Sequence, residues 1–469
     1  MEIDLLVDVS AAGALRNVAP DAFGEDSPAT LRYDRGARPS LRVASSPDVQ
    51  PPALLTMANY YGTLAAVRAL GRAGIPVTTA DPSRFATSAW SKFATDHVRC
   101  PSVREPERFV EWLVHFGRTS EKRVLLATSD DTAWLYSLHR DQLSPYFHLA
   151  SPPVDVVYRL LNKQTLYQEA ARAGLLVPRT WFPESAADLD EIGRHARFPV
   201  MVKPRTQVLF KTQSKGAYVE TREQLPLYYD VMSSQPYHPA LLERDPFASR
   251  PMIQEFYPQA ATGIYNISGF VHRNRLRAVR AARKLLQQPR RLGTGVIFEE
   301  APVIPELAIG LDRLVARVGY SGVFEAEFIE TENGAVLIDF NPRFYNQMQF
   351  DIDRGLALPQ LAYYHALGED GLLDAMCDSM SVEPPANGAV FVDVLSLKVL
   401  LAAQRISGAL SRDDRKKWTD WYAEHRDRCT HGVLDSTDRR PFLLAAAQLL
   451  ARYARHPRNF VRSIALNRY

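Results

Sequence analysis

Val323-Phe324-Glu325-Ala326-Glu327-Phe328-Ile329 carries the clearest signal of the fold, together with the segment Val336-Leu337-Ile338-Asp339-Phe340-Asn341 that follows it. Apolar and acidic residues alternate in the first segment, which is the pattern of a β-strand whose two faces differ. The turn-forming residues Glu332-Asn333-Gly334 separate the two segments, so we expect an antiparallel hairpin. Carboxylates on an otherwise apolar strand are costly unless a positive charge lies beside them.

The polar residues of this hairpin form a candidate metal site. Glu325 and Glu327 share one face of the first strand, and Asp339 and Asn341 share one face of the second. We expect the hairpin to bring Glu327, Asp339 and Asn341 together as oxygen ligands, which suit a Mg²⁺ ion that bridges phosphates. Arg343 follows and can bind anionic oxygens through two hydrogen bonds. The alternative is that these residues form the solvated outer face of an amphipathic hairpin.

The overall composition is typical of a globular enzyme. The 469 residues are enough for two to four packed units, and 46% of them are apolar while 23% are charged. The formal charge of +3 gives no general argument for binding nucleic acid. Three widely separated cysteines predict reduced thiols rather than a disulfide frame or a zinc site. The sequence shows neither the pattern of a signal peptide nor that of a transmembrane segment, so we expect a cytoplasmic protein.

The pattern along the chain predicts four regions. Residues 1–52 form an N-terminal extension that is partly irregular, because Pro, Ser and Asp are frequent and periodicity is weak. Strand, helix and strand patterns alternate over residues 53–150, which predicts a parallel α/β sheet without the GxGxxG of ordinary dinucleotide binding. Residues 151–383 have the pattern of mixed α and β structure. Residues 384–469 are helical and rich in arginine.

Several basic residues are candidates for binding phosphates. Lys203 ends an apolar strand, so that its ammonium group needs an anion. Lys163 opens a helix capped by Asn162, near the positive end of the helix dipole. Residues 205–216 are polar and basic and predict a flap that closes over phosphates. Each lysine alone is more often a surface residue, and an ordinary exposed hairpin is the alternative for the flap.

The strand at residues 251–258 is a candidate for contact with an adenine ring. It is apolar and ends in Gln254-Glu255-Phe256, so that its backbone could hydrogen-bond a base while the aromatic ring packs on it. The alternative is a simple core strand.

In this order, the candidate residues resemble the ATP-grasp superfamily. Within it they are most similar to the carboxylate–amine ligase-like branch, which is related to D-aspartate ligase and the carbamoyl-phosphate synthase large chain. The resemblance covers residues 53–370. It implies an N-terminal parallel α/β (pre-ATP-grasp) domain followed by an ATP-grasp fold over residues 151–383, with a small lid subdomain at about 175–256. The expected helical C-terminal extension lies outside the resemblance. The motifs that carry it are Lys163, Lys203 in Val-Lys-Pro, Gln254-Glu255-Phe256, Arg283-Lys284, Glu327 and Asp339-Phe340-Asn341-Pro342-Arg343.

The resemblance also implies roles for these residues. Lys163 and Lys203 would hold the phosphates of ATP, and Gln254, Glu255 and Phe256 would form the adenine hinge. Mg²⁺, or Mn²⁺ in its place, would be held by Glu327, Asp339 and Asn341. Arg283, Lys284 and Arg343 would form the catalytic group, with the two arginines facing the γ-phosphate and the acyl phosphate.

The implied reaction joins a small-molecule carboxylate to an amine. The carboxylate attacks the γ-phosphate of ATP to form an acyl phosphate, and the amine then displaces phosphate, so that ADP and phosphate are released. Ser129 and Asp130, at the end of a parallel strand, are expected to line one wall of the substrate pocket. Two alternatives remain open: a bicarbonate-using carboxylase or carbamoyl-phosphate-type enzyme, and a non-catalytic ATP-binding regulator.

The C-terminal segment 439–468 carries arginines and no acidic residue. Its leucines predict an amphipathic helix. The helix could dock on an anionic surface or an acidic carrier protein. The favoured alternative is that it packs on the body of the enzyme or on a second copy in a homodimer.

Overall fold

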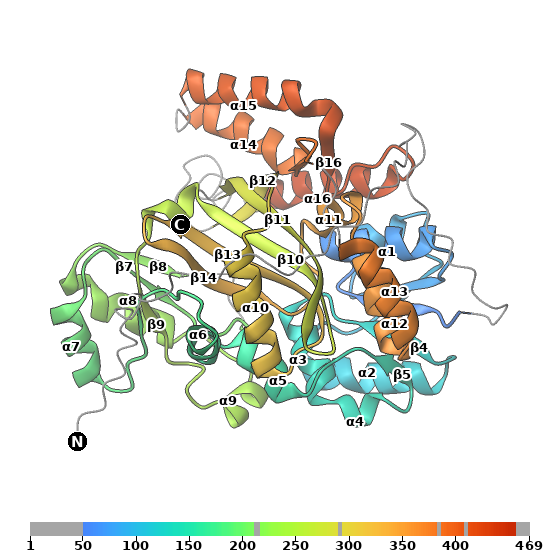
Figure 1. Cartoon of the computed structure of the whole chain (residues 1–469), viewed down its shortest axis with the longest axis horizontal. Helices are drawn as coiled ribbons and strands as arrows, with labels where there is room; N and C mark the ends of the chain where they lie inside the picture. The colour runs from blue at the N-terminus through green and yellow to red at the C-terminus, as the bar shows by residue number, and fades with distance from the viewer. Residues whose placement is uncertain (1–49, 211–215, 289–292, 382–385, 408–410, 456–469) are drawn as a thin grey trace, which may run out of the picture. The chain divides into compact units, whose positions relative to one another are not determined.

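The computed structural model describes residues 50–210, 216–288, 293–381, 386–407 and 411–455. The predictions for residues 1–49 and for the central part of the flap, 211–215, lie outside the described residues. Three sheets organise the described chain, and the order of their strands determines where the candidate residues meet (Figure 1).

The first sheet is the parallel sheet that the N-terminal pattern predicts. Its five strands are in the order β3-β2-β1-β4-β5, and every neighbouring pair is parallel. The carboxyl ends of such strands lie at one edge, where ligands are commonly bound. The strands are β1 (Ala53–Thr56), β2 (Val77–Asp81), β3 (Asp96–Arg99), β4 (Arg123–Leu126) and β5 (Phe147–Leu149), and the helices of this region are α1 (Tyr61–Arg72), η1 (Thr87–Trp90), α2 (Pro106–Arg118), α3 (Asp130–Leu138), α4 (Arg140–Leu143) and α5 (Val154–Leu161).

The second sheet is antiparallel and lies within the predicted lid subdomain. Its four strands follow the order β6-β9-β7-β8. The predicted helix cap at Asn162 is confirmed, since its side chain accepts a hydrogen bond from Gln164 N at the start of α6, and Ser185 caps α7. The elements are α6 (Lys163–Arg172), β6 (Thr180–Trp181), α7 (Ala186–His195), β7 (Val200–Lys203), β8 (Ala217–Val219), η2 (Arg222–Gln224), α8 (Leu225–Ser233), α9 (Pro239–Arg244) and β9 (Met252–Glu255).

The third sheet contains the predicted hairpin at one edge. Its seven strands follow the order β14-β13-β10-β11-β12-β15-β16, antiparallel except for the parallel pair β15 and β16. Helix α10 covers the apolar face, where Phe324, Phe328 and Leu314 share a core. The elements are η3 (Pro258–Ala261), β10 (Ile264–His272), β11 (Arg275–Gln288), β12 (Thr294–Ala301), α10 (Pro305–Val318), β13 (Gly322–Thr331), β14 (Gly334–Asn341), α11 (Met348–Asp353), α12 (Leu358–Leu367) and α13 (Asp370–Ser381).

The C-terminal region is helical, as predicted, and it also extends the third sheet. Strand β15 pairs with β12, so residues beyond 383 complete the sheet that holds the hairpin. Arg68 of α1 donates to Asp438 over 3.0 Å in a buried ion pair, which fixes this region to the parallel sheet region. Its elements are β15 (Val390–Val392), α14 (Val394–Ser407), α15 (Arg412–His425), η4 (Arg426–Arg428), β16 (Cys429–His431) and α16 (Arg440–Arg455).

Helix α16 packs on the body of the protein, which is the favoured alternative for the C-terminal segment. It lies against η1, and Gln448 Nε2 donates to the carbonyl oxygen of Phe85 over 2.6 Å. Leu443 and Leu450 are nonetheless well exposed on this helix. Residues 456–469 lie outside the described residues.

Candidate active site

The hairpin register brings the predicted acidic residues face to face. Glu327 of β13 is paired with Asp339 of β14, and Glu325 is paired with Asn341. The register shifts between Glu327 and Phe328, where the strand pairing is irregular. Paired positions on neighbouring antiparallel strands place side chains within direct reach of each other. The carboxylates and the amide therefore gather at one end of the hairpin.

Two of these carboxylates each meet a lysine from a distant part of the chain. The Lys284 ammonium of β11 lies 3.0 Å from Glu327, and this lysine is only 7% exposed. The Lys163 ammonium, at the first position of α6, contacts the Asp339 carboxylate. The charges on this face of the hairpin are thus compensated, which explains how an apolar strand carries them.

These groups open into a pocket of about 980 Å³, counted to its open mouth. The lining is rich in charge and contains both ammonium groups and carboxylates. The charged residues that line it are Lys163, Lys203, Lys284, Asp130, Glu327 and Asp339.

Lys203 is held at the end of β7 by a neighbouring strand. Its ammonium donates to Gln254 Oε1 over 2.8 Å, and Gln254 Nε2 in turn donates to the hydroxyl of Tyr167 over 3.0 Å. Gln254 is 2% exposed, so this chain of hydrogen bonds fixes the direction of the lysine from within the protein. The position of Lys203 in the pocket is consistent with the predicted contact to phosphate.

Arg343 connects the hairpin to the parallel sheet. Its Nε donates to Asp130 Oδ1 over 2.7 Å, and its Nη2 donates to Asn341 Oδ1 over 2.7 Å. Burial alone would lower the pKa of Arg343, but the charge and hydrogen bond of Asp130, together with the negative charges of Glu325 and Asp339, more than offset this and raise the pKa. Asp130 lines the pocket, whereas Ser129, which was expected beside it on a wall of the substrate pocket, caps α3 through a capping box.

Glu325 is a deeply buried carboxylate of the hairpin. It is 3% exposed and accepts hydrogen bonds from the side-chain amides of Asn266, Gln347 and Asn341. Burial, with the nearby negative charge of Glu327, raises the pKa of Glu325 to about 7. The sequence pattern places Glu325 on the site face, but it gives no sign of its amide partners.

Two predicted groups lie away from this pocket. Arg283 is adjacent to Lys284 on β11 and therefore points to the other face of the strand. There it donates to Glu330 over 2.9 Å, and this hydrogen bond raises the pKa of Arg283. The predicted hinge, Gln254, Glu255 and Phe256, does not line the pocket, and the Phe256 ring packs edge-on against Tyr218 with centroids 4.9 Å apart.

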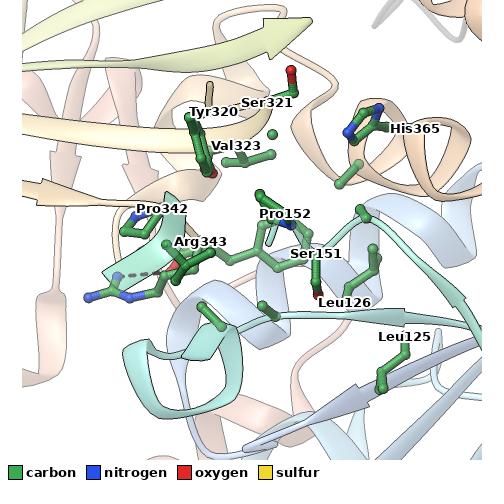
Figure 2. A pocket seen from close by; sticks show the side chains of 17 residues that line it. Leu125, Leu126, Ser151, Pro152, Tyr320, Ser321, Val323, Pro342, Arg343 and His365 are labelled. Atoms are coloured by element: carbon green, nitrogen blue, oxygen red, sulfur yellow. Dashed lines mark hydrogen bonds between the residues drawn. The ribbon is translucent and has the colours of Figure 1, made fainter. Parts of the chain in front are cut away.

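A second pocket has Arg343 in its lining. Figure 2 shows Leu126, Pro152, Tyr320 and Val323 gathered around it, while the guanidinium of Arg343 extends away from Leu126 and Pro152. Burial lowers the pKa of His365, the other lining residue that could carry positive charge. This pocket is therefore mainly apolar and less suited to phosphates than the first.

The donor set of the hairpin fits a metal that a nucleotide helps to bind. Among the residues that the structure describes, no group of three or more His, Cys, Asp or Glu side chains could hold a metal ion. Glu327, Asp339 and Asn341 instead offer two carboxylates and an amide. Mg²⁺ is commonly bound by one or two carboxylates with phosphate oxygens and water as the remaining ligands. Glu327 and Asp339 line the pocket and fit the predicted ion together with ATP, whereas Asn341 does not line the pocket and its amide is bonded to Glu325 and Arg343.

Sequence reasoning missed the polar layer beneath the site. Asn266 and Ser268 alternate on β10, which is buried along its whole length, and Gln347 follows the hairpin. The alternation of polar residues on an apolar strand is the same signal that identifies Glu325 and Glu327. Gln347 carries no such signal, because it lies between two elements.

Among the residues that the structure describes, no helix is both long and apolar enough to cross a membrane.

Comparisons with known proteins agree with this architecture. No protein-family model matches the sequence. The chain is 24% identical over 220 residues to a D-aspartate ligase of Enterococcus faecium (strain Aus0004), which corresponds to 44% of this chain and 50% of the relative. The chain thus spans about half the length of the curated relative that it matches.

Solved structures share the fold at low sequence identity. One is the biotin carboxylase domain of 2-oxoglutarate carboxylase from Hydrogenobacter thermophilus, in complex with MgADP, ADP and bicarbonate, with a TM-score of 0.53, 14% identity and coverage of 67% of this chain and 69% of that one. Another is N5-carboxyaminoimidazole synthetase from Staphylococcus aureus, with a TM-score of 0.50, 12% identity and coverage of 67% and 78%. These structures share the overall fold of the chain, in agreement with the mixed α/β architecture that the sequence resemblance implies.

Proposed function

We propose that this protein is an ATP- and Mg²⁺-dependent ligase that joins a carboxylate to an amine through an acyl-phosphate intermediate. The observation that carries the proposal is the pair of facing carboxylates, Glu327 and Asp339, in a pocket that also contains three lysines. Phosphoryl transfer depends mainly on positioning and on charge stabilisation, which this set of residues can supply.

Each group has a distinct task in this proposal. Glu327, Asp339 and the amide oxygen of Asn341 would hold Mg²⁺, which neutralises charge on the phosphates when it is bound. Lys163 and Lys203 would bind phosphate oxygens, and Lys284 would stabilise charge that develops on the transferred group. The lysines that pair with carboxylates in the structure need only turn their ammonium groups to reach an anion in the same pocket.

Arg343 would act on the carboxylate side of the reaction. It lies between the hairpin and Asp130 at the edge of the parallel sheet, so it can reach anions from either side. A guanidinium group binds two oxygens at once, which suits a carboxylate and then the acyl phosphate formed from it. Arg283 faces Glu330, and we assign it no task in the pocket.

Support for a class of substrate comes from the curated relative and not from the shape of the pocket. The curated relative is a D-aspartate ligase, and an amino acid is therefore the first candidate for either substrate. The test is release of ADP and phosphate with a panel of amino acids and amines, offered singly and in pairs, with Mg²⁺ or Mn²⁺. Release that requires both a carboxylate and an amine, with the amide product seen by mass spectrometry, supports the proposal.

Two other outcomes would contradict it. ADP release that depends on bicarbonate would indicate a carboxylation reaction instead. One of the solved structures that share the fold is a biotin carboxylase domain in complex with bicarbonate. Binding of ATP without turnover for any pair would indicate a regulator. The variant Lys122→Ala, at an exposed position that does not line the pocket, serves as the control for general damage.

A further inference from the structure

The amide group of Asn341 lies between two partners of opposite hydrogen-bonding character. On one side its Nδ2 donates to Glu325 Oε2 over 3.2 Å, and on the other its Oδ1 accepts from Arg343 Nη2 over 2.7 Å. Both carboxylate oxygens of Glu325 accept hydrogen bonds in this structure, and a guanidinium only donates them. The orientation of the amide is therefore fixed from both sides.

Glu325 is itself held in place by two further amides. Its Oε1 accepts from Asn266 Nδ2 over 2.6 Å and from Gln347 Nε2, whereas Oε2 faces Asn341. All four side chains are less than 10% exposed, so water does not compete for these bonds. One carboxylate oxygen therefore anchors Glu325, and the other orients Asn341.

We propose that Glu325 is a positioning residue that turns the amide oxygen of Asn341 toward Arg343 and the metal. This inference rests on the proposed function, because it assumes that Asn341 contributes its oxygen to a cation. Neither Glu325 nor Asn341 is among the residues that line the pocket in the structure, so Glu325 acts on the metal only through Asn341.

The replacement Glu325→Gln tests the inference because it changes one acceptor into a donor at constant shape. The new amide oxygen can keep both anchoring hydrogen bonds, from Asn266 and Gln347. Its nitrogen then faces the nitrogen of Asn341, so that two donors meet. Rotation of the Asn341 amide relieves this conflict but presents N–H groups to Arg343 and to the metal.

A compensating replacement makes the test specific. Asn341→Asp alone places a second carboxylate against Glu325, which should be unfavourable. In the double variant, the new carboxylate at position 341 accepts from the amide nitrogen at position 325 and still presents an oxygen to Arg343. The double variant should therefore recover function that both single variants lose, whereas a role in packing alone predicts that the two losses add.

The experiment measures the Mg²⁺ concentration at half-maximal ATP binding by calorimetry and, in parallel, at half-maximal ADP release. We expect Glu325→Gln to raise both at least about tenfold, the effect usual for groups that orient a metal ligand, and the double variant to return most of this change. An unchanged Mg²⁺ dependence in Glu325→Gln, or additive losses in the double variant, would overturn the inference. The control is Glu332→Gln at the exposed turn of the same hairpin.

The two readouts separate this inference from the proposed function. If no pair of substrates supports ADP release, the ligase proposal fails, but the Mg²⁺ dependence of ATP binding still decides the role of Glu325. If release occurs and the Mg²⁺ dependence is the same in all variants, only the inference about Glu325 fails.

Discussion

Arg343 Nε donates to Asp130 Oδ1 over 2.7 Å, and this ion pair joins residues that are 213 positions apart in the chain. One partner follows the last strand of the hairpin, and the other begins α3 at the edge of the parallel sheet. The ion pair therefore connects the proposed metal end of the cleft with the wall where the sequence pattern places a substrate. We infer that Arg343 couples the two sides of the proposed reaction.

Replacing this arginine should separate catalysis from ATP binding. Arg343→Lys keeps the positive charge but loses the planar group that binds two oxygens at once. We expect kcat to fall by about 10²-fold, similar to the loss of one donor that stabilises a transition state, while ATP binding changes much less. Steady-state kinetics with calorimetric ATP binding would measure the two effects. Arg313→Lys, at an exposed position of α10, should leave both unchanged, and an equal loss in both variants would contradict the assignment.

Removal of a carboxylate ligand should weaken the response to the metal. Glu327→Gln removes a negative ligand and leaves Lys284 without the carboxylate that it contacts at 3.0 Å. We expect the Mg²⁺ concentration for half-maximal ADP release to rise at least about tenfold, because carboxylates are preferred ligands of this ion. A titration with Mg²⁺ at saturating ATP measures it. The metal assignment is wrong if Glu327→Gln is as active as the unmodified protein at the Mg²⁺ concentration that half-saturates the unmodified protein.

Replacing Lys203 tests the binding of ATP phosphates separately from the catalytic step. Lys203→Ala removes an ammonium that Gln254 orients over 2.8 Å. We expect the Kd for ATP to rise about tenfold or more, which corresponds to about 1.4 kcal/mol or more of binding free energy. Calorimetry with ATP and Mg²⁺ measures this change. The exposed Lys122→Ala variant is the control, and equal affinity in the two variants would remove Lys203 from the site.

Asp131 should make the stability of the protein depend on pH. Burial, with the nearby negative charge of Asp130, raises the pKa of Asp131 to about 6, although its carboxylate accepts a hydrogen bond from Leu209 N over 2.7 Å. The folded chain therefore binds this proton more tightly than the unfolded chain, and its contribution to stability is lost as the pH rises from about 4 to about 6. Asp131→Asn keeps the acceptor and removes the titration.

Asp131→Asn should thus gain stability relative to the unmodified protein as the pH rises from about 4 to about 7, by about 1–3 kcal/mol. Urea unfolding at several pH values measures the difference. The exposed Asp141→Asn variant provides the control. A difference between Asp131→Asn and the unmodified protein that does not change with pH would contradict the raised pKa.

A buried ion pair determines how firmly the C-terminal region is attached. Arg68 and Asp438 are each 1% exposed, and Asp438 also accepts from the hydroxyl of Ser91 over 2.7 Å. Arg68→Ala leaves a buried carboxylate without its cation, so we expect a loss of about 3–5 kcal/mol in the free energy of unfolding. Arg68→Met combined with Asp438→Leu should lose less, because no buried charge is left unpaired. Equal losses in the two variants would indicate that lost packing, rather than the unpaired charge of Asp438, lowers the free energy of unfolding.

Strand β11 shows where sequence reasoning fell short in the fold. Arg275–Gln288 is a long strand that carries many basic residues, so it lacks the apolar alternation that predicts a strand. Its charges are neutralised by residues far along the chain, as when Arg277 pairs with Asp374 over 3.1 Å and Lys284 with Glu327. Such partners are absent from any local window of sequence.

In the candidate site, too, one part could be predicted from local sequence and another part could not. Local alternation was sufficient to place Asp339 and Asn341 on one face, since the strand period is set by backbone geometry. It could not show that Arg283 faces Glu330 while its neighbour Lys284 faces the pocket, because the faces of an unrecognised strand cannot be assigned. The motif at Gln254 predicted a contact with adenine. In the structure, the side chain of Gln254 instead accepts a hydrogen bond from Lys203 and orients it.

Local sequence was enough to predict the hairpin, the cap at Asn162, the parallel N-terminal sheet and the kind of chemistry that acidic and basic residues in this order can support. These features depend on contacts within a few residues, where backbone periodicity and hydrogen bonding decide. The packed fold was needed to show which lysine meets which carboxylate, which amides surround Glu325, and that Arg343 reaches Asp130. Those pairs join segments that are distant in the chain, and the charged groups meet only after the packing of apolar faces has brought these segments together.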